Sequence, residues 1–264
     1  KISMNKHHDE FGIYAGSLDL NSIKDVQLPP PEPDGRIKTL SNMGMATTNV
    51  LGLSEEFAEY AGKCNQPVLD AGCAYGETSI AALKKGAKCV VANELQDDFF
   101  NVIVKDKRLN DDDRQRLCFK VGKIPDGIDF PENSFGAIHM SRVMHFFHPE
   151  EVERTFEKAR KWLVPNGRLY ILTASPYHYA TPGFGAVYEE RYEKGEKWPG
   201  EVTDFTINSG QQFAKKTPSY LHEIDPRVLV RVAENHGFLI KKVELYGGEK
   251  DEDYTSAIFI NRKK

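Results

Sequence analysis

The residues with the clearest chemical meaning lie where a short apolar run meets a glycine-bounded turn. The run 67–71 carries Asp70 near its end, and Gly72 and Gly76 enclose the turn that follows. Glycine has no Cβ, so a ligand can lie directly against the backbone there. In open α/β sheets the ligand crevice lies beyond the carboxyl ends of the strands. The pattern therefore predicts a ligand site at this turn.

A second acid, Glu94, closes the next apolar run, about 20 residues further along. In dinucleotide-binding folds a carboxylate at this place accepts hydrogen bonds from a ribose diol. The alternative is a solvated side chain at a strand end. The dinucleotide fingerprint G-x-G-x-x-G is incomplete, because Ala74 stands at its middle glycine. The sequence therefore favours a nucleoside cofactor without phosphates over a nicotinamide dinucleotide.

Alternating strands and helices are needed to bring these acids to one edge of a sheet. The apolar periodicity predicts strands at 67–71, 88–93, 117–121, 135–140 and 168–173, and helices at 77–85, 96–107 and 150–163. A helix is also expected from Ser54, with that residue as its N-cap. After a helix at 226–236, the strands 238–245 and 254–260 are too close for a parallel crossover. We predict an α/β fold with seven strands, a mostly parallel sheet with helices on both faces, and an antiparallel C-terminal strand pair.

Composition limits the kind of protein. The chain has 264 residues, 28% of them charged, and a formal net charge of -4, which argues against a broad charge-driven binder of nucleic acid or membrane surfaces. No apolar run approaches the roughly 20 residues that span a bilayer. The four cysteines are not paired as C-x-x-C, and we expect apolar fillers of a reducing, cytoplasmic protein and no metal site. The oligomeric state stays open.

Taken in order, the motifs resemble those of class I S-adenosylmethionine-dependent methyltransferases, in the small-molecule, methyltransferase-11-like branch. The turn 70–76 is similar to their first motif and Glu94 to their second. The segments 124–135, 141–146 and 162–168 are similar to those before their fourth strand, at its exit and before their fifth strand. Together these segments cover about 67–173. The resemblance implies a Rossmann-like sheet, S-adenosyl-L-methionine as cofactor and methyl transfer as the reaction.

The resemblance also implies a role for each matching position. The turn, with Asp70, Gly72, Ala74 and Gly76, would meet the amino-acid end of the cofactor. Glu94 would hold the ribose, and the remaining positions would border the adenine or the sulfonium: Leu95, Gly122, Lys123 and Ile124 for the adenine, Ser141 and Arg142 for the sulfonium. Two positions depart from the family pattern. Lys123 replaces an acid that meets the adenine amino group, and Gly136 replaces an aspartate.

Methyl transfer from a sulfonium is an in-line displacement that chiefly needs alignment and exclusion of water. If the acceptor loses a proton, the candidates for accepting it are His145, Tyr177 and His178, with His148 and Tyr179 behind them. His145 is favoured because it follows the fourth strand on the ligand side, whereas His139 lies inside that strand and is expected to pack. For each candidate the alternative is a packed or solvent-facing side chain.

The expected organisation is an N-terminal arm at 1–52 that covers the cofactor near 41–48, and a methyltransferase domain at 53–264. An aromatic insertion at 175–220, which includes Phe205, is expected to act as a lid over the acceptor; the alternative is a satellite core. We expect a small-molecule acceptor, with a protein acceptor second, and neither a nucleic-acid nor a membrane partner. The alternatives are a non-catalytic S-adenosylmethionine-binding protein, a nicotinamide-dependent dehydrogenase and an aminopropyl-transferring relative.

Overall fold

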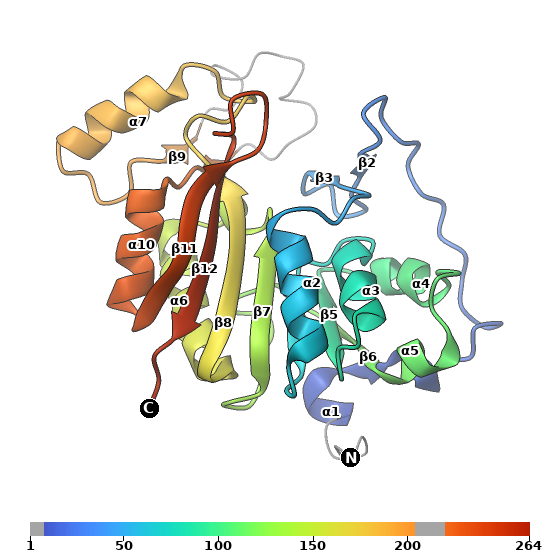
Figure 1. Ribbon diagram of the computed structural model, residues 1–264. Helices are drawn as coiled ribbons and strands as arrows, with labels where there is room; N and C mark the ends of the chain where they lie inside the picture. The colour runs from blue at the N-terminus through green and yellow to red at the C-terminus, as the bar shows by residue number, and fades with distance from the viewer. Residues whose placement is uncertain (1–7, 204–219) are drawn as a thin grey trace.

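A single eight-stranded sheet organises the protein, whose computed structural model describes residues 8–203 and 220–264 (Figure 1). The sheet has the order β1-β6-β5-β4-β7-β8-β12-β11. Five strands run parallel: β4 (Val68–Ala71), β5 (Val90–Glu94), β6 (Leu117–Val121), β7 (Phe135–Ser141) and β8 (Leu163–Ala174). The strands β11 (Phe238–Tyr246) and β12 (Tyr254–Asn261) pair antiparallel, with β12 against β8. The predicted mostly parallel sheet with an antiparallel C-terminal pair is confirmed.

The sheet has eight strands where seven were expected. The additional strand, β1 (Ile13–Tyr14), comes from the N-terminal arm and pairs antiparallel with β6, so that Ile13 lies opposite Phe119. A strand of two residues has no measurable alternation of apolar and polar residues, so its sequence carries no signal. It follows the short helix α1 (His8–Phe11) and leads into a 3₁₀ turn, η2 (Ala15–Ser17).

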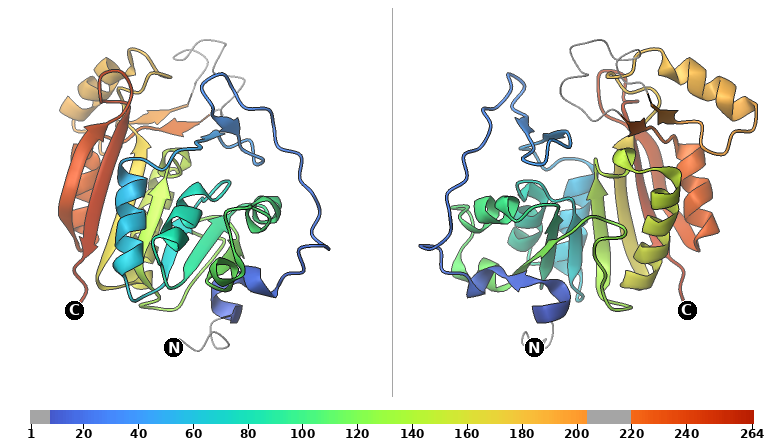
Figure 2. Two further views of the ribbon diagram at one scale, coloured as in Figure 1. Left: turned by 45° about the vertical axis from the view of Figure 1, so that its right-hand side comes forward. Right: turned by 180° about the vertical axis from the view of Figure 1, so that it is seen from behind.

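Helices cover both faces of the sheet because successive strand residues point to opposite sides. One core contains side chains of α6 (Pro149–Trp162) and α10 (Pro226–Asn235), among them Phe156 and Leu229. The other contains side chains of α2 (Leu53–Lys63), α3 (Glu77–Lys84) and α4 (Asp98–Val104), among them Phe57 and Ile103. Figure 2 shows α2 and α3 on one side of the sheet and α6 on the other.

The expectation that Ser54 caps α2 is wrong. Gly52 is the N-cap, and Ser54 lies inside the first turn of the helix. Its hydroxyl is 2.9 Å from Nε2 of His139. Ser54 is the second residue of the helix, past the N-cap position from which a side chain serves the free N–H groups.

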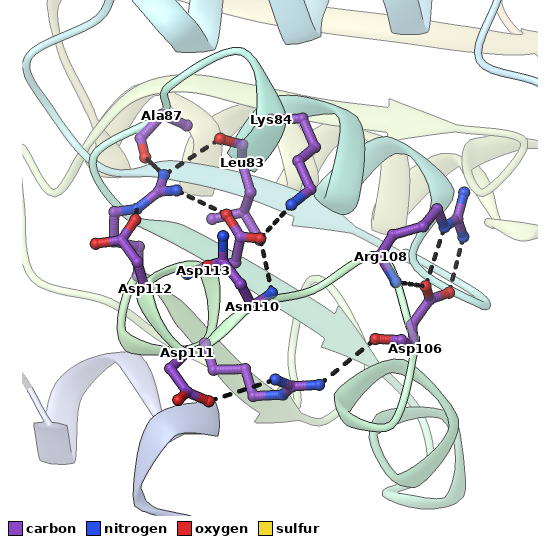
Figure 3. Close-up of polar contacts among 11 residues, drawn as sticks. Leu83, Lys84, Ala87, Asp106, Arg108, Asn110, Asp111, Asp112 and Asp113 are labelled. Atoms are coloured by element: carbon purple, nitrogen blue, oxygen red, sulfur yellow. Dashed lines mark hydrogen bonds and ion pairs between the residues drawn. The ribbon is translucent and has the colours of Figure 1, made fainter.

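A charged cluster fixes the end of α3 against the start of β6 (Figure 3). The helix α5 (Asp111–Gln115) begins with a capping box in which the side chains of Asn110 and Asp113 each accept a backbone N–H of the other. Asp113 is buried and also accepts a hydrogen bond from Lys84 at 2.5 Å. Arg116 donates to the carbonyl oxygens of Leu83, in the last turn of α3, and of Ala87, beyond the helix. The cluster thus ties α3, and with it the turn before α3, to the sheet.

The insertion between β8 and α10 contains α7 (Phe184–Glu193) and a small antiparallel pair, β9 (Glu201–Val202) with β10 (Leu221–His222). Part of the expected lid, including Phe205, lies outside the described residues. In the arm, β2 (Ile37–Lys38) pairs with β3 (Met45–Ala46), and a 3₁₀ turn, η3 (Met144–Phe146), follows β7. All four cysteines are free thiols. None of the described helices combines the length and the apolar character that crossing a membrane requires.

Candidate active site

A cavity opens at the carboxyl ends of β4, β5, β6 and β7, and we refer to it as the first cavity. The β4–α3 turn and the ends of β5, β6 and β7 form its floor and sides, and the arm contributes residues around β3. Nearly every residue expected at the ligand site lines it: Asp70, Gly72, Ala74, Glu94, Leu95, Gly122, Lys123, Ile124, Ser141 and Arg142. Gly76 is not among the described lining residues.

Glu94 is held in place by two backbone N–H groups. The Ala74 N–H donates to one carboxylate oxygen and the Leu95 N–H to the other, both at 2.9 Å. Burial raises the pKa of Glu94 above its ordinary value, while the two hydrogen bonds oppose that shift. A carboxylate has about four acceptor positions, so the fixed group still has capacity for the hydroxyls of a ligand. Leu95 is 40% exposed and offers the same cavity an apolar surface.

Asp70 is the centre of a buried polar chain. Its Oδ1 is 2.8 Å from His139 Nδ1, and its Oδ2 accepts the Ser79 hydroxyl at 2.7 Å. His139 Nε2 in turn contacts Ser54 at 2.9 Å. Asp70, His139 and Ser54 all line the first cavity. If Nδ1 of His139 carries the proton for Asp70, Nε2 accepts the Ser54 hydroxyl, and the Ser54 oxygen is left as an acceptor.

The β4–α3 turn depends on two glycines that have positive φ. A Cβ on Gly72 (φ +65°) would stand 2.4 Å from Val143, and a Cβ on Gly76 (φ +82°) would stand 2.8 Å from Ile103. Gly76 is therefore required by packing, because the Ile103 side chain of α4 occupies the space that a Cβ would need. Ala74, at the middle glycine of the incomplete fingerprint, also has positive φ, +47°. This strained backbone aims the Ala74 N–H at Glu94.

Two other expected positions have contacts that the sequence did not reveal. Lys123 forms an ion pair of 2.9 Å with Glu151 at the start of α6. Arg142 has positive φ (+59°) and its guanidinium lies 4.8 Å from the ring centre of Tyr254, a residue of β12. No carboxylate in 8–203 or 220–264 forms an ion pair with Arg142.

A second cavity adjoins the first. Five residues line both cavities and form the wall between them: Met43, Met45, Thr47, Arg142 and Phe146. The remaining lining comes from the arm turn at 32–36, the exits of β7 and β8 and the start of β12. Among the expected proton acceptors, His145 and His178 line this cavity, as does Tyr179.

Both histidines of the second cavity use Nδ1 as an acceptor. The Ala174 N–H donates to Nδ1 of His145, and the Ala180 N–H donates to Nδ1 of His178, each at 3.1 Å. Burial is the main cause that lowers the pKa of His145 to about 3 and that of His178 to about 4, and the positive charge of Arg142 adds to both shifts. Each ring is therefore neutral near pH 7 with its proton on Nε2.

Tyr177 lies elsewhere. Its hydroxyl donates to Glu189 of α7 at 2.6 Å, and Tyr177 is not among the described residues that line the two cavities. His148 caps the start of α6 and stacks on Tyr220 at 4.0 Å between ring centres.

The N-terminal arm contributes several residues to the first cavity. The Tyr75 hydroxyl donates to the Lys38 carbonyl at 2.7 Å, and Thr39, Ser41 and Met43 line the cavity. Sequence reasoning missed Ser54, His139 and Tyr254, which come from elements far apart in the chain. Of these, only His139 carried a signal, as a polar residue inside an apolar strand.

Residues 68–167 match a family model described as a methyltransferase domain. Among curated proteins, the chain is similar to the histone-arginine methyltransferase CARMER of Anopheles gambiae, with 30% identity over 136 residues, 51% of this chain and 21% of that protein. The protein of the same name from Drosophila persimilis is 29% identical over 133 residues, 50% of this chain and 24% of that protein. The chain thus aligns with about a fifth to a quarter of the length of these relatives.

Solved structures share the fold at low identity. An S-adenosylmethionine dependent methyltransferase from Mesorhizobium loti is 16% identical, with a TM-score of 0.54 over 79% of this chain and 100% of that one. The Burkholderia thailandensis 1,6-didemethyltoxoflavin-N1-methyltransferase was solved with 1,6-didemethyltoxoflavin and S-adenosylhomocysteine. It is 15% identical, with a TM-score of 0.55 over 80% of this chain and 77% of that one. The glycopeptide N-methyltransferase MtfA, solved with S-adenosylmethionine, is 17% identical, with a TM-score of 0.54 over 88% of this chain and 99% of that one.

Proposed function

Because residues 68–167 match a methyltransferase domain and the fold is shared with S-adenosylmethionine-dependent methyltransferases, we propose that the chain binds S-adenosylmethionine and transfers its methyl group to a small molecule. The match over residues 68–167 confirms the expected methyltransferase domain, and the cofactor is part of the proposal. The acceptor and the roles of individual residues are proposals, since the curated relatives are matched over only a fraction of their length.

The first cavity fits the cofactor by the chemistry of its donors and acceptors. The fixed carboxylate of Glu94 suits a ribose diol, and the half-exposed Leu95 suits the adenine face. The Ser54 oxygen, which His139 and Asp70 orient, suits the ammonium of the amino-acid end. Lys123 is paired with Glu151, so adenine recognition at this position is assigned to the backbone of Gly122 and Ile124.

The wall shared by the two cavities carries the proposal. When bound, the cofactor supplies a methyl group that is already activated by a sulfonium. The chain's task is then to hold the acceptor in line with that methyl group and to exclude water. An acceptor in the second cavity meets a first-cavity ligand across Met43, Met45, Thr47, Arg142 and Phe146, most of which are apolar.

The arm and the insertion are proposed to enclose these two ligands. The arm, 1–52, contributes Thr39, Ser41 and Met43 to the first cavity and Arg36 to the second. The insertion, 175–220, contributes His178, Tyr179 and Ala180 to the second cavity.

A protein arginine acceptor, suggested by the names of the curated relatives, is the second candidate for the same cavity. A guanidinium is held by carboxylates, and two carboxylates, Glu32 and Asp34, do line the second cavity. Asp34, however, is already paired with Arg36 at 2.7 Å. The residues that follow β7 present Arg142 and His145 to the cavity instead, and the charge of Arg142 disfavours a cationic acceptor.

Calorimetric titration with S-adenosylhomocysteine tests the proposal. We expect micromolar binding to the wild type and at least about tenfold weaker binding to Glu94→Ala, because that variant loses the diol acceptor. Glu59→Ala, which removes an exposed surface carboxylate paired with Lys85, is the matched control. Binding of NAD in place of S-adenosylhomocysteine would revive the dehydrogenase alternative and overturn the proposal. Binding without methyl transfer to any acceptor in a screen would favour a non-catalytic protein.

A further inference from the structure

The second cavity is unusual in the chemistry of the groups that the sheet presents to it. Arg142, His145 and His178 all line it, and each offers hydrogen-bond donors there. The two imidazoles are fixed as donors because the N–H groups of Ala174 and Ala180 occupy Nδ1. Neither Nε2 has a hydrogen-bond partner in the described part of the chain. An imidazole in this state gives a hydrogen bond at Nε2 and cannot accept a proton there.

Arg142 is held at the same place by its backbone and by an aromatic ring. Its backbone N–H donates to the Leu172 carbonyl at 2.7 Å, with the residue in the left-handed region. Tyr254 lies under the guanidinium at 4.8 Å and also contacts the His178 ring edge-on, with 5.1 Å between centres. A residue kept in a strained conformation beside a cavity is a functional candidate. The ring thus places the cation next to one of the two imidazole donors.

The carboxylates of the cavity belong to a different element. Asp34 and Glu32 lie in the arm turn, where the Glu32 N–H donates to the Arg36 carbonyl. Arg36 binds Asp34 and also donates to the Tyr179 hydroxyl at 3.0 Å. The charge of Arg36 is therefore matched within the arm, whereas Arg142 has no described carboxylate partner.

We propose that the acceptor carries a carboxylate, which pairs with Arg142 and accepts hydrogen bonds from His145 Nε2 and His178 Nε2. This inference rests on the proposed function, because it names the class of acceptor for the same site. It also gives the two histidines a binding role: they orient the acceptor and take no proton from it. The carboxylate would neutralise the charge of Arg142, which would otherwise add a second positive charge beside the sulfonium of the cofactor.

Benzoate and benzamide are the probes, because they share shape and differ in charge. Ligand-observed NMR of the protein saturated with S-adenosylhomocysteine should give a dissociation constant for benzoate in the millimolar range and about tenfold weaker binding of benzamide. Arg142→Met should remove the preference for benzoate. Arg154→Met, which removes an exposed guanidinium paired with Asp126, should leave it unchanged. Equal binding of the two probes, no binding of benzoate, or an unaffected Arg142→Met variant would each overturn the inference.

The same titration without S-adenosylhomocysteine separates the two proposals. A benzoate preference in a protein that does not bind S-adenosylhomocysteine would overturn the proposed function and keep the anion site. Normal S-adenosylhomocysteine binding without a benzoate preference would overturn the anion site alone. The ring ¹⁵N shifts of His145 and His178 provide an independent readout, since both should show the Nε2–H tautomer. A proton on Nδ1 of either ring would contradict its role as a donor.

Discussion

His139 Nδ1 lies 2.8 Å from Asp70 Oδ1, between two parallel strands and underneath α2. The side chains of His139 and Asp70 are 4% and 2% exposed. The Ser79 hydroxyl holds the second oxygen of Asp70. Both oxygens of Asp70, near the end of β4, are therefore bonded within the protein, and Asp70 can act on a ligand only through His139 and Ser54.

Replacing His139 tests how much this chain of contacts contributes to stability. His139→Phe keeps a ring against Phe57 but removes a hydrogen-bond donor from a buried carboxylate, which should lower the free energy of unfolding by about 2–3 kcal/mol. Ser54→Ala, which cuts only the outer link, should cost about 1 kcal/mol. Urea unfolding measures both. Equal losses for the two variants would show that Asp70 does not depend on His139.

The positive φ of Ala74 predicts a stabilising substitution. Ala74→Gly relieves left-handed strain of about 1–2 kcal/mol at a loss of up to about 1 kcal/mol in chain entropy, so the net gain should be about 0.5–1 kcal/mol. The control is Ala81→Gly inside α3, which should lose about 1 kcal/mol. Thermal or urea unfolding distinguishes them. A loss in Ala74→Gly would mean that the alanine methyl group packs favourably enough to offset the strain.

The buried Glu223 should make the free energy of unfolding fall as pH rises. It is fully buried, Thr181 donates to one of its oxygens at 3.0 Å, and its other oxygen has no partner in the described chain. Burial raises its pKa well above the ordinary value. The contribution of the neutral acid is thus complete below about pH 4.3 and is lost as pH rises through the folded-state pKa.

Glu223→Gln is neutral at every pH and should therefore be more stable than the wild type at pH 8, by about 1–3 kcal/mol. The difference should disappear near pH 4. Urea unfolding at the two pH values measures it, with Glu157→Gln at an exposed position of α6 as the control. A constant difference between the variants at both pH values would contradict titration of Glu223.

His222 should have the opposite effect, because it should make the free energy of unfolding fall as pH falls. Its Nδ1 lies 2.9 Å from the Phe147 carbonyl, and burial lowers its pKa from 6.5 to about 4. Stability that is complete above pH 6.5 is then lost as pH falls towards 4, by about 2 kcal/mol at pH 5. His222→Asn keeps a donor for the carbonyl. Between pH 7 and pH 5 its free energy of unfolding should fall by about 2 kcal/mol less than that of the wild type. Urea unfolding at the two pH values measures the difference.

Local signals in the sequence were sufficient for the fold and for much of the first cavity. The alternation of strands and helices, the glycine turn after β4 and the acid at the end of β5 each depend on residues close together in the chain. Their place at the carboxyl edge then follows from the topology of a parallel sheet. Glu94 is the clearest example, since its type and position at a strand end indicated its location.

Contacts between distant segments were not predictable. Ser54 reads as a helix cap, and only the packing of α2 on β7 turns its hydroxyl towards His139. Likewise, the expectation that His145 or His178 accepts a proton came from residue type and, for His145, from its position after the fourth strand. Their hydrogen bonds with the Ala174 and Ala180 N–H groups depend on how the chain folds after β8, and these bonds determine which nitrogen carries the proton.

The two-residue strand β1 also bears on solubility. An open sheet edge offers free N–H and C=O groups to other chains, and the apolar β6 would be such an edge without Ile13 and Tyr14. The opposite edge, β11, carries Lys241 and Lys242 beside an irregularity in its pairing with β12, both of which discourage edge-to-edge association. The N-terminal segment that contributes residues to the first cavity therefore also covers one edge of the sheet and protects it against aggregation.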